Sequence, residues 1–296
     1  MVVQERLNQF ISEQKVAVQQ ELRQHLHGLD IPERLKASML YSVEAGGKRL
    51  RPVLLLAAYQ AYSNDTKRAL APAIALEMVH TYSLIHDDLP AMDNDDLRRG
   101  QPTNHKMYDE ATAILAGDAL LTYSFELIVN DPHLTDSQKV RTIQLLSEAS
   151  GPKGMVAGQM LDMKAEHKAL TLEELETIHT LKTGALLRFA ISTGASLGGA
   201  EPEQINHLGL FAYHLGLIFQ VQDDILDVSG DPDKIGKPVG SDEANNKNTY
   251  PKLLGLEGAK AKKNHYVHKA KESLYHAGAA SSYLALLTDY FSSRDY

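Results

Sequence analysis

Residues 84–100 read Leu-Ile-His-Asp-Asp-Leu-Pro-Ala-Met-Asp-Asn-Asp-Asp-Leu-Arg-Arg-Gly, and the rest of the chain can be organised around them. Five aspartates fall between Asp87 and Asp96, and Arg98 and Arg99 follow them. Clustered carboxylates prefer hard cations such as Mg2+, and guanidinium groups beside them suit phosphate oxygens. The stretch therefore predicts a site for a metal-bridged phosphate or diphosphate. The alternative is a charged helix end with salt bridges.

The segment that leads into this stretch, residues 68–86, is apolar on nearly all sides. A helix of that kind is buried on most of its faces. Pro90 lacks the N–H group that a helix interior needs, so we expect the chain to leave the helix between Asp88 and Asp93. The pattern thus predicts a core helix that ends in an acidic turn.

Helical spacing of apolar residues continues through most of the remaining chain. Thr171 to Glu174 has capping-box spacing, and Pro32 suits the first turn of a helix. Further helices are predicted at residues 3–27, 32–45, 53–61, 109–129, 136–149, 154–164, 172–198, 202–228, 257–275 and 281–292. Short connections and the lack of a convincing strand predict an all-α fold, as one domain over residues 1–296.

The composition narrows the possible classes of protein. The chain has 296 residues, no cysteine and a net charge of −8 without a long basic run. Thiol nucleophiles and disulfides are therefore excluded, and nucleic acid is not an expected partner. No apolar stretch has the length of a membrane-spanning helix, and the N-terminus lacks the basic-then-apolar order of a signal peptide. We expect a cytoplasmic protein without a membrane span.

A second acidic cluster lies in residues 219–227, Phe-Gln-Val-Gln-Asp-Asp-Ile-Leu-Asp. Asp223 and Asp227 are four residues apart, so on a helix they share one face. Such a pair repels unless a cation bridges it or water screens it, and the apolar neighbours weaken the second explanation. One pair alone is more typical of a solvated face. Two clusters in one helical chain predict two walls that hold Mg2+ ions on a shared diphosphate.

Positive charge is placed to match these carboxylates. Residues 46–52, Gly-Gly-Lys-Arg-Leu-Arg-Pro, put three cations at a glycine-rich turn before a helix, where backbone N–H groups add to an anion site. A solvated basic turn is the alternative. Other candidate cations are Arg98, Arg99, Lys182, Lys237 and Lys247. Together they are enough for two diphosphates. No nucleophile stands out, so loss of diphosphate, with metal ions stabilising the leaving charge, is the expected chemical step.

Five segments, in this order, resemble the trans-isoprenyl diphosphate synthase family, and most closely its bacterial farnesyl-forming members. They are Gly47–Pro52, Asp87–Asp93 with Arg98–Gly100, Gly158–Met163, Lys182–Gly184 and Phe219–Asp227. The four-residue spacer between Asp88 and Asp93 is similar to the bacterial and plastid form of the first motif. The resemblance implies an isoprenoid synthase-type antiparallel helical bundle around a central cavity, a homodimer and three Mg2+ ions.

The resemblance also implies roles for single residues. The metal ligands would be Asp87, Asp88, Asp93, Asp223 and Asp227. The allylic diphosphate would be held by Arg98, Lys182 and Lys237. The diphosphate of isopentenyl diphosphate would be held by Lys48, Arg51, His80 and Arg99. Oxygens of Thr183 and Gln220 would stabilise the allylic cation. The implied reaction is ionisation, attack by the isopentenyl double bond and loss of a proton. Taken alone, His80 is more typical of a satisfied core polar group.

Tyr82 and Ser83 bear on product length. Tyr82 lies five residues before Asp87, which is about 7–8 Å along a helix. A large ring there would form a floor under the growing prenyl chain, and Ser83 beside it is small. An ordinary core tyrosine is the alternative. With this spacer, an aromatic residue resembles enzymes that stop at farnesyl diphosphate. Geranylgeranyl and geranyl diphosphate synthases remain alternatives.

Three other functions can be weighed against this one. A class I terpene cyclase also ionises a diphosphate but needs no second diphosphate site, so the basic turn and the second acidic motif argue against it. A non-catalytic regulatory subunit of a prenyl synthase is expected to lack one acidic motif, and both are present. A helical scaffold whose carboxylates bind only surface cations stays open.

Overall fold

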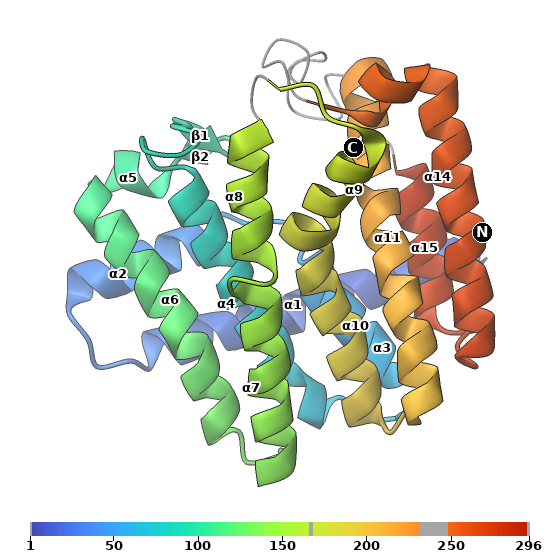
Figure 1. Ribbon diagram of the computed structural model, residues 1–296. Coiled ribbons are helices and arrows are strands. Elements are labelled where there is room, and N and C mark those ends of the chain that lie inside the picture. The colour runs from blue at the N-terminus through green and yellow to red at the C-terminus, as the bar shows by residue number, and fades with distance from the viewer. Residues whose placement is uncertain (1, 166–167, 231–247, 295–296) are drawn as a thin grey trace. The chain divides into compact units, whose positions relative to one another are not determined.

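The computed structural model describes residues 2–165, 168–230 and 248–294, and these fold almost entirely as helices (Figure 1). The chain falls into two compact units. Unit 1 comprises Met1–Leu56 and Asp65–Gln144, and unit 2 comprises Ala57–Asn64 and Leu145–Tyr296. The all-α prediction is confirmed. A single domain over residues 1–296 stays a prediction.

Unit 1 is built around α4 (Lys67–Asp87), which packs most extensively against α6 (Glu110–Asn130). Thirteen residues of α4 are buried, as the apolar run predicts. The other helices of this part of the chain are α1 (Val2–His27), α2 (Glu33–Glu44), α3 (Leu50–Gln60), α5 (Asn104–Met107) and α7 (Asp136–Ser150), of which α3 and α7 continue into unit 2. The predicted core helix at residues 68–86 is thus confirmed within a residue at each end.

A short hairpin follows the acidic stretch and was not predicted. Strand β1 (Leu97–Arg98) pairs antiparallel with β2 (Gln101–Pro102). Its turn residues Arg99 and Gly100 have φ angles of 55° and 77°. Strands of two residues carry too little alternation to be recognised from a sequence.

Helix α6 has one face in the core of unit 1 and another that is exposed and apolar. Among the described residues it is the one helix long and apolar enough to cross a membrane by length and composition alone, and 39% of that window is buried. Core helices of helical proteins meet the same criterion. Ile114, Leu115 and Val129 are 43%, 59% and 49% exposed. The helix packs against α2 and α4 and leaves these side chains uncovered.

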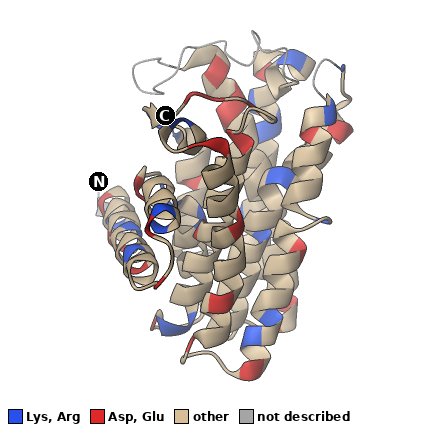
Figure 2. Cartoon of the chain, turned by 90° about the vertical axis from the view of Figure 1, so that its left-hand side faces the viewer, with Lys and Arg blue, Asp and Glu red and all other residues tan. Residues whose placement is uncertain are grey.

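Unit 2 is organised around α11 (Pro202–Ser229), which packs most extensively against α14 (Tyr250–His276). Its other elements are α8 (Met155–Ala165), α9 (Leu172–His179), the π-helix η1 (Thr180–Gly184), α10 (Ala185–Gly198) and α15 (Tyr283–Ser293). Figure 2 shows basic and acidic residues distributed over the helices of the chain, between longer stretches of uncharged residues. Around the second acidic motif, Leu217, Ile218, Val221 and Ile225 are buried, as the apolar neighbours in the sequence predict.

Two helices of unit 2 differ from their predicted form. The capping box at Thr171 is present, but the predicted helix at residues 172–198 contains the π-helical turn η1. Helix α14 starts at Tyr250, seven residues before the predicted start at 257. Thr249 caps it, and Pro251 fits its first turn. Gly255, with a φ of 72°, kinks the helix and interrupts the periodic pattern.

Candidate active site

The first acidic motif lies where α4 ends. The N–H group of Asp93 donates to the carbonyl oxygen of Asp87 at 2.9 Å, and that of Asn94 donates to Leu89 at 3.1 Å. The predicted exit between Asp88 and Asp93 is therefore confirmed, with Pro90 in the turn. A backbone hydrogen bond in this turn thus joins the first and last aspartates of the motif.

Asp88 contacts the hairpin that follows the motif. Its carboxylate accepts from Arg98 Nε at 2.7 and 2.9 Å and lies 2.5 Å from Nη2. The Asp88 side chain is only 4% exposed, and this burial raises the pKa of the carboxyl group although Arg98 opposes the shift. Asp88 therefore orients Arg98 in this structure. A role in metal binding stays a prediction.

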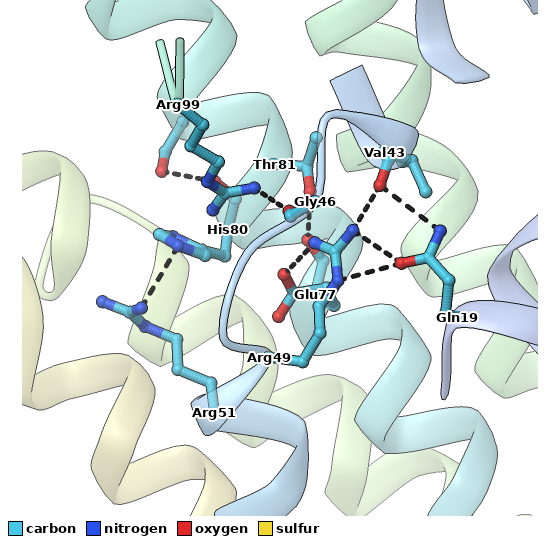
Figure 3. A network of polar contacts seen from close by, with 10 residues as sticks. Gln19, Val43, Gly46, Arg49, Arg51, Glu77, His80, Thr81 and Arg99 are labelled. Carbon is cyan, nitrogen blue, oxygen red and sulfur yellow. Dashed lines mark hydrogen bonds and ion pairs between the residues drawn. The ribbon is translucent and has the colours of Figure 1, made fainter. Parts of the chain in front are cut away.

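The basic turn and the hairpin meet His80 within unit 1 (Figure 3). Arg51 Nη1 lies 3.2 Å from His80 Nε2, and Arg99 Nη1 donates to the carbonyl oxygen of Gly46. Burial, and then the charges of Arg51 and Arg99, lower the pKa of His80 well below 6.5. A neutral imidazole surrounded by cations marks a region of positive potential. Lys48 is half-buried on the same turn.

Tyr82 and Ser83 lie on α4 beside these groups. The Tyr82 ring is 6% exposed and meets His86 edge-on, with 5.7 Å between ring centroids. Burial and the charge of Asp87 raise the pKa of Tyr82 to about 12. Ser83 Oγ donates to the carbonyl oxygen of His80 at 2.9 Å. Tyr82 is thus a neutral, buried ring close to the acidic motif, and its role in chain length stays a prediction.

In unit 2, the π-helical turn carries Lys182 and Thr183. Single π-turns inside helices occur frequently at functional sites. A side chain at Gly158 would collide with the backbone of Lys182, so α8 approaches the turn closely only because residue 158 is glycine. One helical turn further on, Asp162 Oδ2 lies 2.5 Å from Lys182 Nζ. Sequence analysis assigned no role to Asp162.

Thr183 and Gln220 are brought together in this unit. The hydroxyl group of Thr183 donates to Gln220 Oε1 at 3.0 Å, and Thr183 is 9% exposed. Because the hydroxyl proton is used in this bond, the oxygen can turn a lone pair toward positive charge. The two residues are thus arranged as a pair of polar oxygens in an apolar helical environment.

The second acidic motif has a partner that sequence analysis missed. Arg294 forms an ion pair with Asp223, and its guanidinium lies 4.2 Å from the centre of the Phe219 ring. Asp224 accepts from the N–H group of Tyr250 at 2.8 Å. Asp223 is 44% exposed, whereas Asp227 is buried at 2%. No pattern in the sequence links residues so far apart as Asp223 and Arg294.

The carboxylate oxygens of the two acidic motifs are suitable ligands for Mg2+ ions that bind at the same time as a diphosphate. Within the described ranges, no three Asp, Glu or His side chains form a preassembled metal cluster. Mg2+ is usually bound by one or two carboxylates plus substrate phosphates rather than by a protein cage. Asp87, Asp93 and Asp223 are partly or fully exposed and offer the oxygen ligands that this ion prefers. Lys237 and Lys247 lie outside the described residues.

The chain is similar to known prenyl diphosphate synthases over nearly its whole length. The chain is 52% identical over 292 residues to a farnesyl diphosphate synthase of Geobacillus stearothermophilus, which covers 98% of each chain. It is 45% identical over 290 residues to a chloroplastic geranylgeranyl pyrophosphate synthase of Capsicum annuum, covering 97% of this chain and 78% of that protein. The crystal structure of a putative farnesyl-diphosphate synthase from Marinomonas sp. MED121 matches with a TM-score of 0.83 at 42% identity, covering 97% of this chain and 99% of the other.

The family model for polyprenyl synthetases matches residues 32–281. That range contains all five segments on which the resemblance rests. The structural match extends the agreement to an isoprenoid synthase-type helical fold. This chain therefore belongs to the polyprenyl synthetase family.

Proposed function

We propose that this protein is a Mg2+-dependent prenyltransferase that condenses isopentenyl diphosphate with dimethylallyl and geranyl diphosphates to give (2E,6E)-farnesyl diphosphate. The observation that carries the proposal is the basic cluster that Arg51 and Arg99 form around the neutral His80 in unit 1. A cyclase that ionises one diphosphate has no use for a second anion site. The cluster is suited to the diphosphate of the second substrate, with Lys48 on the same turn.

The side chains of the two acidic motifs and their neighbours would carry the ionisation step. Three Mg2+ ions on Asp87, Asp93 and Asp223, when bound, would stabilise the charge that develops on the departing diphosphate. Lys182 and Arg98 would donate hydrogen bonds to the same diphosphate, each oriented by a carboxylate, Asp162 and Asp88 respectively. Charge-assisted bonds of this kind are among the strongest that a protein offers.

Carbon–carbon bond formation would follow beside Thr183 and Gln220. The allylic carbon–oxygen bond breaks with its electron pair on the diphosphate, and the isopentenyl double bond attacks the allylic carbon. The departing diphosphate then takes the proton that restores a double bond. The hydrogen-bonded oxygens of Thr183 and Gln220 would stabilise the positive charge between these steps.

Farnesyl diphosphate is proposed as the product because Tyr82 is buried and bulky at the predicted floor. The similarity to a geranylgeranyl pyrophosphate synthase keeps a longer product as the second candidate. The proposed enzyme is cytoplasmic and a homodimer. The exposed apolar face of α6, with Ile114, Leu115 and Val129, is a surface that a second copy would cover.

Product analysis tests the proposal. Purified protein would be incubated with Mg2+, labelled isopentenyl diphosphate and dimethylallyl diphosphate, and the dephosphorylated products would be separated by chromatography. We expect a fifteen-carbon product with Mg2+ and none with a chelator. Labelled product of twenty carbons would favour the second candidate, and the absence of any prenyl product would reject the proposal.

A further inference from the structure

The basic turn has three cations, Lys48, Arg49 and Arg51, which differ in how deeply their side chains are buried. Lys48 and Arg51 are half-buried, whereas the Arg49 side chain is 0% exposed. A guanidinium that is closed off from solvent in this way cannot reach a soluble substrate. Arg49 therefore needs an explanation other than diphosphate binding.

The guanidinium of Arg49 is held by three different helices (Figure 3). Nη1 lies 2.5 Å from Glu77 Oε1 on α4, and Nε and Nη2 donate to Gln19 Oε1 on α1 at 3.2 and 2.8 Å. Nη2 also donates to the carbonyl oxygen of Val43 on α2. These contacts tie the start of α3 to α1, α2 and α4 at one point.

Stability alone does not explain why Arg49 is buried in these contacts. Burying both charges of an ion pair removes their hydration, which offsets much of their mutual attraction. Arg49 also has a φ of 51°, in the left-handed region that disfavours residues with a side chain. Strained residues held firmly by their surroundings are typical of functional sites.

The anchored turn sets the positions of the cations that face the proposed anion site. Arg51 follows Arg49 by two residues and reaches His80, which is on α4 one turn from Glu77. On the other side of the turn, the guanidinium of Arg99 packs against Gly47, where a side chain would come within 2.6 Å of it. Arg99 also donates to Gly46. A shift of the turn would therefore move Arg51 away from His80 and displace Arg99.

We propose that Arg49, paired with Glu77, is a positioning residue for the isopentenyl diphosphate site. It neutralises Glu77 and locks the left-handed turn, so that Lys48, Arg51 and Arg99 supply the net positive charge to the substrate. This inference rests on the proposed function. It predicts that damage to the anchor weakens binding of isopentenyl diphosphate much more than binding of the allylic substrate.

Arg49→Lys and Gln19→Met test the role by different routes. The first keeps the charge but loses the planar fork, and the second removes an acceptor on α1, far from any reacting atom. We expect KM for isopentenyl diphosphate to rise about tenfold or more in Arg49→Lys, and by less in Gln19→Met. KM for geranyl diphosphate should stay within about twofold in both. Arg34→Gln, which breaks the exposed pair with Asp109, is the matched control and should leave both KM values unchanged.

Calorimetric binding of isopentenyl diphosphate and thermal unfolding complete the test. Weaker binding by a variant with a near-native unfolding midpoint supports the positioning role. An unchanged KM for isopentenyl diphosphate, or equal losses for both substrates together with a lower midpoint, overturns it. If Arg49→Lys does not fold, Gln19→Met decides on the same criteria. A wild-type protein that forms no product would instead reject the proposed function, and its failure to bind isopentenyl diphosphate would reject the positioning role as well.

Discussion

The two acidic motifs obtain their countercharges in different ways. In the first motif, Asp88 pairs with Arg98 only ten residues later, on the hairpin that directly follows. In the second, Asp223 pairs with Arg294, which is 71 residues away. The Asp88 side chain is 4% exposed and that of Asp223 is 44% exposed. In the first pair a buried carboxylate thus orients a partly exposed arginine, whereas in the second a buried arginine binds a carboxylate that remains accessible.

This difference suggests that carboxylates within one motif do different work. Asp87 and Asp93 bracket the turn, and Asp88 between them is committed to Arg98. In the second motif Asp223 is the accessible member, while Asp224 binds the backbone of α14 and Asp227 is buried. We therefore expect function to depend most on Asp87, Asp93 and Asp223.

Asp87→Asn and Asp223→Asn are expected to have the largest effect on turnover. Each should lower kcat by roughly 100- to 1,000-fold, because each removes a full negative charge from the proposed metal ligands. Thermal unfolding should change little, since both side chains are partly exposed to solvent. The measurement is steady-state turnover at saturating substrates and Mg2+. Asp96→Asn, in the same acidic stretch but paired with Lys106, is the control and should keep near-native turnover. Normal turnover in either motif variant would contradict the two-motif account.

Tyr82→Ala should change the product rather than the rate. Removing the ring opens space beside the first motif only, so the prenyl chain can grow past fifteen carbons. Chromatography of the dephosphorylated products should then show twenty-carbon or longer alcohols. Tyr213→Ala, on α11 in the other unit, should leave the product profile unchanged. An unchanged profile in Tyr82→Ala would discard the floor.

Gly158→Ala tests the close approach of α8 to the π-helical turn in unit 2. The added methyl group would collide with the backbone of Lys182, so we expect a loss of about 1–3 kcal/mol in the free energy of unfolding. Turnover should fall as well, because Lys182 and Thr183 move. Gly209→Ala, where nothing lies within 4 Å of the new atom, should instead stabilise α11 by up to about 1 kcal/mol. Equal effects of the two substitutions on denaturant unfolding would show that the contact is unimportant.

Arg294→Gln should have the smallest effect and the opposite sign. Removing its charge frees Asp223 from a competing cation, so Mg2+ should bind more tightly. An ion pair with one exposed partner is worth under about 1 kcal/mol, which corresponds to a gain of roughly two- to fivefold in affinity. Calorimetric titration with Mg2+ beside an inert allylic diphosphate analogue measures this. Lys271→Gln, which breaks the exposed pair with Asp289, is the control. Weaker Mg2+ binding in Arg294→Gln would contradict competition.

Local patterns in the sequence were sufficient to predict much of the fold. The buried character of α4 follows from the apolar residues on nearly all of its sides, and the end of α4 follows from Pro90. The capping box at Thr171 likewise marks a true helix start. Each of these features depends on residues within a few positions of one another. They could therefore be predicted without knowledge of the fold.

Features that depend on distant contacts could not be predicted. The π-helical turn at Lys182 is packed against Gly158 on another helix, and Arg294 lies beside Asp223 because α14 and α15 pack against α11. Arg49 and Arg51 are indistinguishable in sequence, yet only tertiary packing buries Arg49. The family resemblance was confirmed by the comparisons, whereas the assigned roles of the site residues stay predictions.

Coupling between Mg2+ and an allylic diphosphate tests the central claim most directly. The protein would be titrated with Mg2+ by calorimetry, alone and with an inert allylic diphosphate analogue, and Asp223→Asn would be titrated in the same way. If the two acidic motifs bind metal jointly with the diphosphate, the analogue should tighten Mg2+ binding at least about tenfold, a coupling of roughly 1.4 kcal/mol, and the variant should lose most of that gain. Equal Mg2+ affinity with and without the analogue would contradict the account.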